Sequence, residues 1–395
     1  MPRVTPHGRE AIALPPATRH IRKRVKAFAR VFALAPDCHT AGRYMRVWQR
    51  HFYDGLQGAL PSVVLPVAVN FGWARPPAAA TLGPSHDRGV MSARLWDQIR
   101  TAHAERGLDA VISYCFSSDV DPALIEHTVE LGIPWINFFC DSTYAFDLVE
   151  ALARVTSLNW FPELAADARY RALGRPVLCR PYAVHPAALP EASCETAEHA
   201  LGFVGAPTGN RVLRLAGLRL FGCPTEVRGE GWQRTTAAAP RPRPAQPPPA
   251  HFDRRMRGAL GERILVRALK PLVRGRGHPL ADDEMVFFLS RCRVVLGLNE
   301  GRDTEGVYRS YLKLRDVEFP GYGCCYLTQH NEDVTHAFEV GREVLTFRHA
   351  AEAASLVRQS ERHPEAARAM GQAARRRVLA EHTWAARLLE LARAL

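Results

Sequence analysis

The sequence lacks three features that would assign it to a common class of protein. Among its 395 residues, no apolar run approaches the roughly 20 residues that a membrane-spanning helix needs, which excludes an integral membrane protein. No Gly-x-Gly-x-x-Gly motif follows a first strand in either half, so a dinucleotide-dependent oxidoreductase is not predicted. The nine cysteines include no Cys-x-x-Cys pair, so we expect no zinc site. We expect the cysteines to be buried free thiols in a reducing cytoplasm.

Lysine is scarce: of the 52 basic residues, four are Lys and the others are Arg. The net charge of the chain is +12. Residues 1–60 hold 11 basic and 3 acidic residues, a net of +8, and residues 233–278 hold 11 and 2, a net of +9. Two basic segments favour contact with an anionic acceptor, such as a phosphorylated lipid carrier, and a cytoplasmic protein that is peripheral at the membrane is one alternative. A solvated surface explains them equally well, and nucleic-acid binding rests on these segments alone.

Apolar runs alternate with helical patterns throughout the chain, which predicts an α/β fold with parallel sheets. The strands expected in the first half are Val31–Ala35, Val63–Val69, Ala110–Phe116, Trp135–Cys140 and Val177–Tyr182. Those expected in the second half are Leu201–Gly205, Arg219–Phe221, Thr225–Arg228, Val294–Leu298 and Cys324–Thr328. Helical spacing covers Ser92–Arg106, Pro122–Leu131 and Trp384–Leu395.

The length is about twice that of a typical domain, so we expect two domains. The first covers residues 1–190 and the second residues 191–383, and a terminal helix occupies 384–395. Residues 237–250 are rich in proline and cannot supply strand hydrogen bonds, so they should form an exposed loop.

Several strand ends in the second half carry residues suited to binding an anion. A strand, a glycine turn and a helix start aim backbone N–H groups and a helix dipole at a phosphate. The candidate contacts from these segments are Gly205, Thr208, Asn210, Arg211, Gly229, Trp232 and Asn299. Each has a structural alternative, because Asn210 could cap a helix, Trp232 could pack on a turn and Asn299 could form one.

The segment from Tyr311 to Val344 is the most informative part of the chain. A carboxylate such as Glu318 can take both hydroxyls of a ribose, and a guanidinium such as Arg315 can hold a diphosphate by paired hydrogen bonds. Gly321 and Gly323 would let the backbone approach a ligand closely. The alternative for the first two residues is a structural Arg–Glu pair.

The pattern Arg-x-x-Glu-x-x-x-x-Gly, followed by an apolar strand and Phe-x-x-Gly-x-Glu, resembles the C-terminal half of CgeB-like (spore maturation protein B-like) glycosyltransferases. The Phe-x-Gly-x-x-x-x-Asn-Arg segment that ends at Arg211, the Gly-x-Gly-Trp at Trp232 and the Glu-His-Thr-Trp at residues 381–384 resemble the same family. The resemblance covers residues 105–232 and 278–390.

This resemblance implies a GT-B fold, in which two Rossmann-like domains face a central cleft. The first domain would hold the acceptor, the second a nucleotide-sugar donor, and the terminal helix would pack back on the first. It also implies sugar transfer without a bound metal or cofactor. A non-catalytic nucleotide-sugar or polyanion-binding protein with the same fold stays open.

The acceptor side should lie at loops that follow the first-domain strands, because ligands of open α/β sheets bind outside the carboxyl ends of the strands. An inverting enzyme needs an acid–base residue there, whereas a retaining one needs none. The candidate bases are Asp141, Asp119 and His39. The sequence does not choose among them, or between the two stereochemical outcomes.

Overall fold

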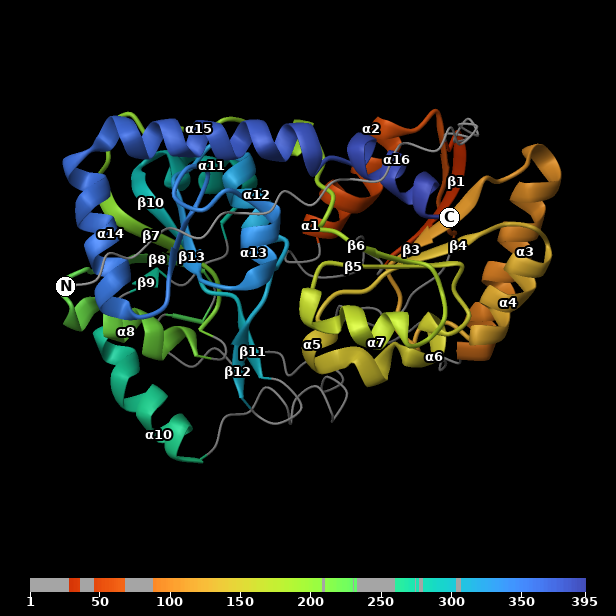
Figure 1. The fold of residues 1–395 in the computed structure, drawn as a ribbon, viewed down its shortest axis with the longest axis horizontal. Helices are drawn as coiled ribbons and strands as arrows, with labels where there is room; N and C mark the ends of the chain where they lie inside the picture. The colour runs from red at the N-terminus through yellow and green to blue at the C-terminus, as the bar shows by residue number, and fades with distance from the viewer. Residues whose placement is uncertain are drawn as a thin grey trace, which may run out of the picture.

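A computed structural model of the chain describes residues 28–35, 46–67, 88–207, 210–229, 231–232, 260–273, 275–276, 280–302 and 307–395. These residues form two domains side by side, each built on one parallel sheet (Figure 1). The predicted α/β fold class is therefore correct. His39, Thr208 and the Pro-rich segment 237–250 lie outside the described residues.

The first domain contains a six-stranded sheet in the order β2-β1-β3-β4-β5-β6, and every pairing is parallel. Its strands are β1 (Arg30–Leu34), β2 (Ser62–Val64), β3 (Ala110–Ser113), β4 (Trp135–Phe138), β5 (Leu158–Phe161) and β6 (Val177–Cys179). All were expected except β5.

The helices of the first domain follow these strands. They are α1 (Arg46–Trp48), a π-helix (Gln49–Tyr53), α2 (Asp54–Ala59), α3 (Arg88–Arg106), α4 (Pro122–Glu130), α5 (Ser142–Ala145), α6 (Glu150–Ala153) and α7 (Asp167–Arg171). The Asp121 side chain caps α4 by accepting from the Ala123 N–H, and Pro122 occupies the first turn as the sequence predicts.

The second domain contains a six-stranded parallel sheet in the order β14-β13-β10-β7-β8-β9. Its strands are β7 (His199–Val204), β8 (Glu226–Arg228), β9 (Gly275–Arg276), β10 (Cys292–Gly297), β13 (Tyr326–Gln329) and β14 (Leu345–Phe347). Counted within the domain, this is the doubly wound order 3-2-1-4-5-6, whose direction reverses between β7 and β10.

The strand expected at Arg219–Phe221 is wrong, because these residues end a helix. Val212, Leu215 and Ala216 recur at helical spacing and are buried, so the segment folds as α8 (Arg211–Leu220). The other helices are α10 (Leu260–Leu269), α11 (Asp282–Ser290), α12 (Arg315–Gly321), α13 (Glu332–Ala337), α14 (Ala350–Arg362), α15 (Pro364–Glu381) and α16 (Trp384–Ala394). A hairpin of β11 (Glu300–Arg302) and β12 (Tyr308–Ser310) follows β10.

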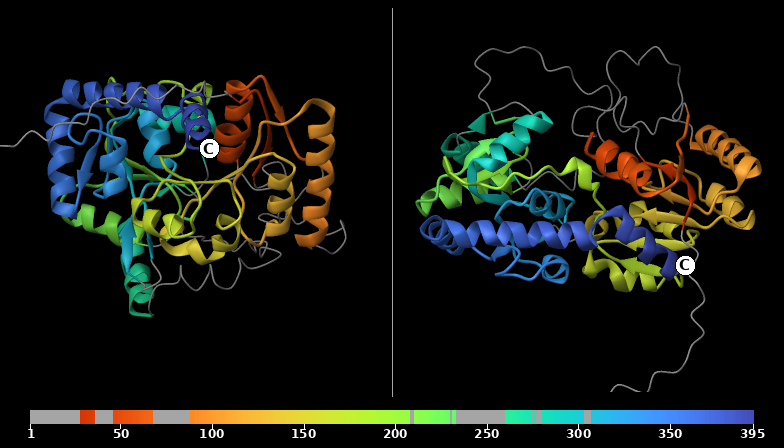
Figure 2. Two further views of the ribbon diagram at one scale, coloured as in Figure 1. Left: turned by 45° about the vertical axis from the view of Figure 1, so that its right-hand side comes forward. Right: turned by 90° about the horizontal axis from the view of Figure 1, so that it is seen from above.

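The long helix α15 runs along the second domain and leads into α16, which lies on the first (Figures 1 and 2). Trp384 begins α16 and is almost fully buried against Phe52 and Trp160, whose rings lie 5.5 and 5.6 Å from its own. Its indole N–H donates to the backbone oxygen of His51. Gly55 faces the indole, where a Cβ atom would come within 2.4 Å. The end of the chain thus completes the core of the first domain.

Seven of the eight described cysteines are buried free thiols, as expected, and Cys179 is half-buried. Within the described ranges, no helix combines the length and the apolar character that crossing a bilayer requires.

Candidate functional site

The direction of the second sheet reverses between β7 and β10, and the loops at this edge diverge. Gly205 directly follows β7 and Asn299 lies just beyond β10. A crevice at such a reversal is where doubly wound sheets bind ligands. Arg211, at the start of α8, and Arg315, at the start of α12, also belong to this region.

The loops after β7 and β8 press against each other. Gly229 has φ 131°, and a Cβ atom there would lie 2.5 Å from the oxygen of Gly205. The indole N–H of Trp232 donates to that same oxygen at 2.6 Å. Trp232 is 4% exposed, so it is a buried packing residue that supports the Gly205 loop through this hydrogen bond.

The Arg211 guanidinium lies beside this loop, and the charge of a second guanidinium, that of Arg315, acts on it. The Arg211 Nε and Nη1 atoms donate to the backbone oxygens of Leu298 and Ala206, both at 3.1 Å. Burial, and next the positive charge of Arg315, lower the pKa of Arg211 to about 9. Within the described residues, no carboxylate lies at ion-pair distance from Arg315, whose guanidinium rests 5.5 Å from the centre of the Phe319 ring. An anion between the two groups would relieve their repulsion.

Asn210 precedes α8 but does not cap it. Its amide donates to the Glu300 carboxylate at 2.9 Å, and Arg214 forms an ion pair with the same group. Asn210 therefore joins α8 to the β11–β12 hairpin.

Asn299 is held by a buried carboxylate. Asp316 is 1% exposed and accepts hydrogen bonds from Asn299 at 2.8 Å, Tyr326 at 2.9 Å and Thr328 at 3.0 Å. Burial raises the pKa of Asp316, and these hydrogen bonds oppose the rise. Asp316 thereby joins the start of α12 to β10 and β13.

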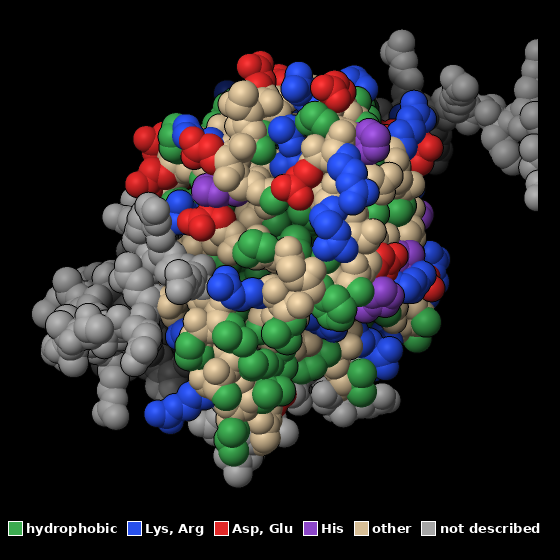
Figure 3. Space-filling view, turned by 90° about the vertical axis from the view of Figure 1, so that its left-hand side faces the viewer, with side chains coloured by type: hydrophobic (Ala, Val, Ile, Leu, Met, Phe, Trp, Pro, Cys, Tyr) green, Lys and Arg blue, Asp and Glu red, His purple; other side chains and the backbone are tan. Residues whose placement is uncertain are grey.

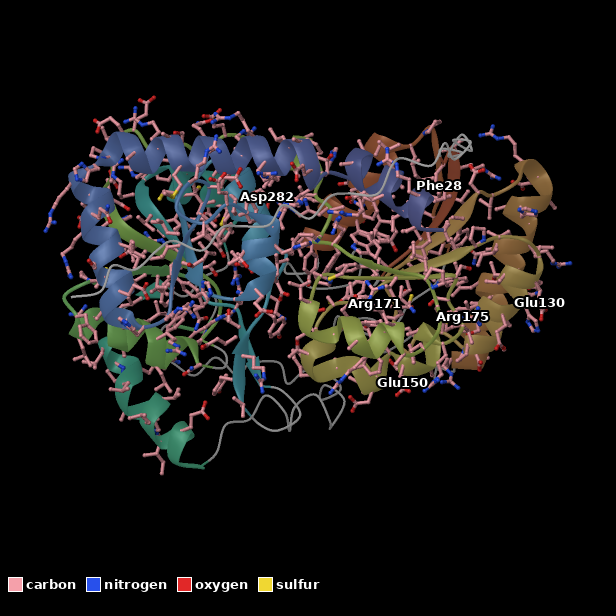
Figure 4. All side chains as sticks on the ribbon, viewed as in Figure 1. Phe28, Glu130, Glu150, Arg171, Arg175 and Asp282 are labelled. Carbon is pink, nitrogen blue, oxygen red and sulfur yellow. The ribbon has the colours of Figure 1, made fainter. Side chains whose placement is uncertain are left out.

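Glu318 faces the first domain. Its Oε1 atom lies 3.3 Å from Nε2 of His51 and 3.5 Å from Nη2 of Arg50. Arg50 also pairs with Asp282 of α11 at 3.0 Å, and Asp282 is labelled below α15 in Figure 4. The His185 N–H donates to Nδ1 of His51 at 3.2 Å, so the imidazole carries its proton on Nε2 and donates it to Glu318. Burial raises the pKa of Glu318, but His51, Arg50 and Arg315 together lower it below its usual value.

Gly321 and Gly323 have packing reasons for being glycine. A Cβ atom at Gly321 would come within 2.6 Å of Leu189 and 3.2 Å of Val378, where α12 packs against α15. Gly323 has φ 85° in the turn that ends α12, a conformation that favours glycine. These contacts involve the interdomain linker and α15.

Asp141 of the first domain contacts Lys313 of the second. It follows β4 with φ 62°, the one positive φ among the described residues other than glycine. The Lys313 ammonium pairs with this carboxylate and lies 4.2 Å from the centre of the Tyr311 ring. Burial lowers the pKa of Lys313, but the Asp141 charge outweighs it and raises the pKa above the usual range. The pair links the two domains.

A second carboxylate, missed by sequence analysis, stands behind Asp141. Glu163 is fully buried after β5 and accepts a hydrogen bond from the Ser142 N–H at 3.2 Å. Burial, and next the charge of Asp141, raise the pKa of Glu163 to about 8, so it is protonated at neutral pH. The sequence signal that could have identified Glu163 is its position: it is an acidic residue that closely follows an apolar strand, β5.

Asp119 of the first domain and His382, between α15 and α16, have structural roles. Asp119 is buried and accepts a hydrogen bond from the Phe116 N–H at 2.7 Å, which stabilises the turn after β3. His382 is buried, and its Nε2 atom lies 3.3 Å from the oxygen of Ala337. Burial lowers the pKa of His382 to about 3, which fits a structural role. In the part of the chain that the structure describes, no three His, Cys, Asp or Glu side chains gather as metal ligands would.

Comparison with known proteins gives a match to one protein family over part of the chain. Residues 215–393 match the model of a glycosyl transferase-like family, a range that includes Arg315 and Glu318 but not Gly205 or Arg211. No curated protein matches the chain.

Three solved structures illustrate the fold. HepE from Anabaena, in complex with UDP-glucose, is 11% identical, with 93% of this chain and 100% of that chain covered and a TM-score of 0.53. Sucrose-phosphate synthase from Thermosynechococcus elongatus is 13% identical, with coverages of 92% and 98% and a TM-score of 0.53. AviGT4, a glycosyltransferase involved in avilamycin A biosynthesis, is 15% identical, with coverages of 92% and 96% and a TM-score of 0.50. The chain has the GT-B fold. The expected arrangement of two Rossmann-like domains is thereby confirmed.

Proposed function

We propose that this protein is a glycosyltransferase that moves a sugar from a nucleotide-diphosphate sugar to an acceptor hydroxyl. The observation that carries the proposal is that Arg211 and Arg315 both lie at the reversal point of the second sheet. Arg211 donates to the oxygen of Leu298, and Asp316, next to Arg315, accepts a hydrogen bond from Asn299. The glycosyl transferase-like match over residues 215–393 and the GT-B fold support it. HepE, which shares the fold, was crystallised with UDP-glucose, and this makes a uridine nucleotide the first donor to test.

In the proposed donor complex, Arg211 and Arg315 hold the diphosphate and Glu318 binds the ribose. His51 and Arg50 occupy Oε1 of Glu318 and keep the carboxylate ionised, which leaves Oε2 to accept from the ribose hydroxyls. The negative charge that develops on the leaving diphosphate would be stabilised by guanidinium groups without a bound metal.

On the acceptor side, we assign the role of base to Asp141. Its carboxylate would take the proton of the acceptor hydroxyl while the hydroxyl oxygen bonds to the anomeric carbon and the bond to the diphosphate breaks. Asp119 is the weaker candidate because its carboxylate already accepts from the Phe116 N–H within its own turn. His39 lies outside the described residues.

Membership of the CgeB-like group is the finer part of the proposal, and it rests on the motif resemblance at residues 105–232 and 278–390. We propose a cytoplasmic enzyme with an acceptor that is anionic or attached to a membrane, because the two basic segments of the sequence would attract such a molecule.

One observation favours a second candidate function. Lys313 pairs with the carboxylate of Asp141, the proposed base, and so competes with an acceptor hydroxyl for it. Such a pair suits a nucleotide-sugar-binding protein that holds its ligand without reacting. Binding without turnover, unaffected by replacing Asp141, would favour this alternative.

Calorimetric titration with UDP, GDP, dTDP and CMP, in buffer with EDTA, tests the proposal. We expect saturable binding of one nucleotide to the wild type and at least about tenfold weaker binding to Arg315→Met. Arg106→Met, an exposed arginine at the end of α3, serves as the control. Turnover is then followed as release of free sugar from the matching donor. A folded protein that neither binds nor hydrolyses any donor would refute the proposal.

A further inference from the structure

Two helices of the second domain expose large apolar side chains on one face. Leu220 and Phe221, at the end of α8, are 74% and 53% exposed, and Ile264 and Leu265 of α10 are 62% and 48% exposed. The helices pack against each other and against the turn Lys270–Leu272. In the space-filling view, hydrophobic side chains gather over the lower part of the molecule, where α10 projects (Figure 3).

Helix α10 is apolar on two sides. Val266 and Leu269 pack on the core cluster between the sheet and α8, whereas Ile264 and Leu265 point away from it and are exposed. Ile264 and Leu265 are therefore apolar side chains that the domain's own core leaves uncovered, as expected of a surface that meets another apolar phase.

The charge of this face is positive. Residues 211–222 and 260–273 contain six basic residues and a single acidic one, Glu262, which accepts a hydrogen bond from the Tyr308 hydroxyl. Arg211 and Arg214 are directed into the domain, but Arg219 and Arg267 are exposed beside the apolar side chains.

An apolar strip flanked by exposed cations is complementary to the surface of an anionic bilayer. The apolar side chains enter the boundary between headgroups and acyl chains, and each nearby cation is attracted to acidic lipid. A protein partner would need to be both apolar and acidic to match this face, whereas an anionic membrane has both properties throughout.

We propose that the face formed by α8, α10 and the turn Lys270–Leu272, here called the α8–α10 face, binds anionic lipid bilayers and holds the protein at the membrane surface. This attachment is independent of the proposed chemistry, because it uses none of the residues that face the cleft.

Vesicle co-sedimentation of the full chain tests this proposal. The probes are vesicles of phosphatidylcholine alone, which are uncharged, and vesicles in which about 30% of the lipid is phosphatidylglycerol, which makes their surface negative. We expect binding to the anionic vesicles, and a loss of about tenfold or more in Ile264→Ser/Leu265→Ser, because both side chains lose most of their apolar area. The matched control is Val90→Ser/Leu131→Ser, two exposed aliphatic residues of the first domain.

A charge variant separates the electrostatic part of membrane binding from the apolar part. Arg267→Glu should weaken binding to anionic vesicles about fivefold or more, and Arg106→Glu should leave it unchanged. Nucleotide binding by each variant shows that the protein is folded and that its cleft is intact. Three results would overturn the proposal: no binding of the wild type to anionic vesicles, equal binding of Ile264→Ser/Leu265→Ser, or a wild-type dimer that this variant converts to a monomer without any effect of vesicles.

Discussion

The Nε2 atom of His51, in the first domain, lies 3.3 Å from Oε1 of Glu318, in the second. Because the His185 N–H fixes the tautomer of this imidazole, the hydrogen bond to Glu318 has a defined direction. The proposed ribose ligand is therefore oriented by the opposite domain, and replacing either residue should alter both domain packing and donor binding.

Replacing His51 with alanine should lower the free energy of unfolding by about 2–4 kcal/mol, because it removes a buried side chain and leaves Glu318 without its main donor. The change is measured by chemical denaturation. His51→Gln retains an N–H donor near the same position and should recover part of the loss. Equal destabilisation by both variants would show that the hydrogen bond to Glu318 contributes little.

Replacing Arg315 with methionine should weaken nucleotide binding by about 10- to 100-fold, since charge-assisted hydrogen bonds to phosphate contribute roughly 1.5–3 kcal/mol. The melting temperature of the free protein should fall little or rise, because the substitution removes the repulsion of Arg211. Titration calorimetry and thermal unfolding measure the two effects. Unchanged affinity would remove Arg315 from the donor site.

Asp141→Asn should slow donor hydrolysis by about 100-fold or more while the affinity for the nucleotide stays unchanged, because a general base is lost but no donor contact is. Asparagine tolerates positive φ, so the backbone at 62° should be retained. Asp119→Asn is the matched control and should keep the wild-type rate. A fall in rate only with Asp119→Asn would reverse the assignment.

The buried Glu163 should make stability depend on pH. Its pKa is raised from 4.5 to about 8 in the folded protein, so folding favours the protonated form. The resulting stability is full below pH 4.5 and is lost as pH rises through about 8. Glu163→Gln mimics the neutral acid and should be more stable than the wild type at pH 9 by roughly 2–4 kcal/mol. Denaturation at pH 6 and pH 9 tests this, and parallel profiles for the two proteins would contradict it.

The sequence predicted most of the fold because buried parallel strands are short apolar runs, and β1, β3, β4, β10 and β13 have that character. It missed β5, β9 and β14, which contain four, two and three residues. It misread the end of α8 because Arg219–Phe221 is too short to show a helical period. Local pattern is weakest in such short segments.

The site was less accessible to sequence reasoning. Arg315 and Glu318 were expected from motif and chemistry, but their partners were not. Glu318 meets His51 across 267 positions of sequence, and Lys313 meets Asp141 across 172. Such pairs depend on how the two domains are oriented, which no local pattern encodes.

The burial of Trp384 in the first domain also has a consequence for synthesis of the chain. The surfaces of Phe52 and Trp160 that receive the indole belong to a domain whose other strands end at Cys179, so they emerge from the ribosome about 200 residues earlier than the residue that covers them. At a typical 5–20 residues per second, this apolar surface stays open for roughly 10–40 seconds on each nascent chain. The first domain thus leaves an apolar surface open until α16 has been made.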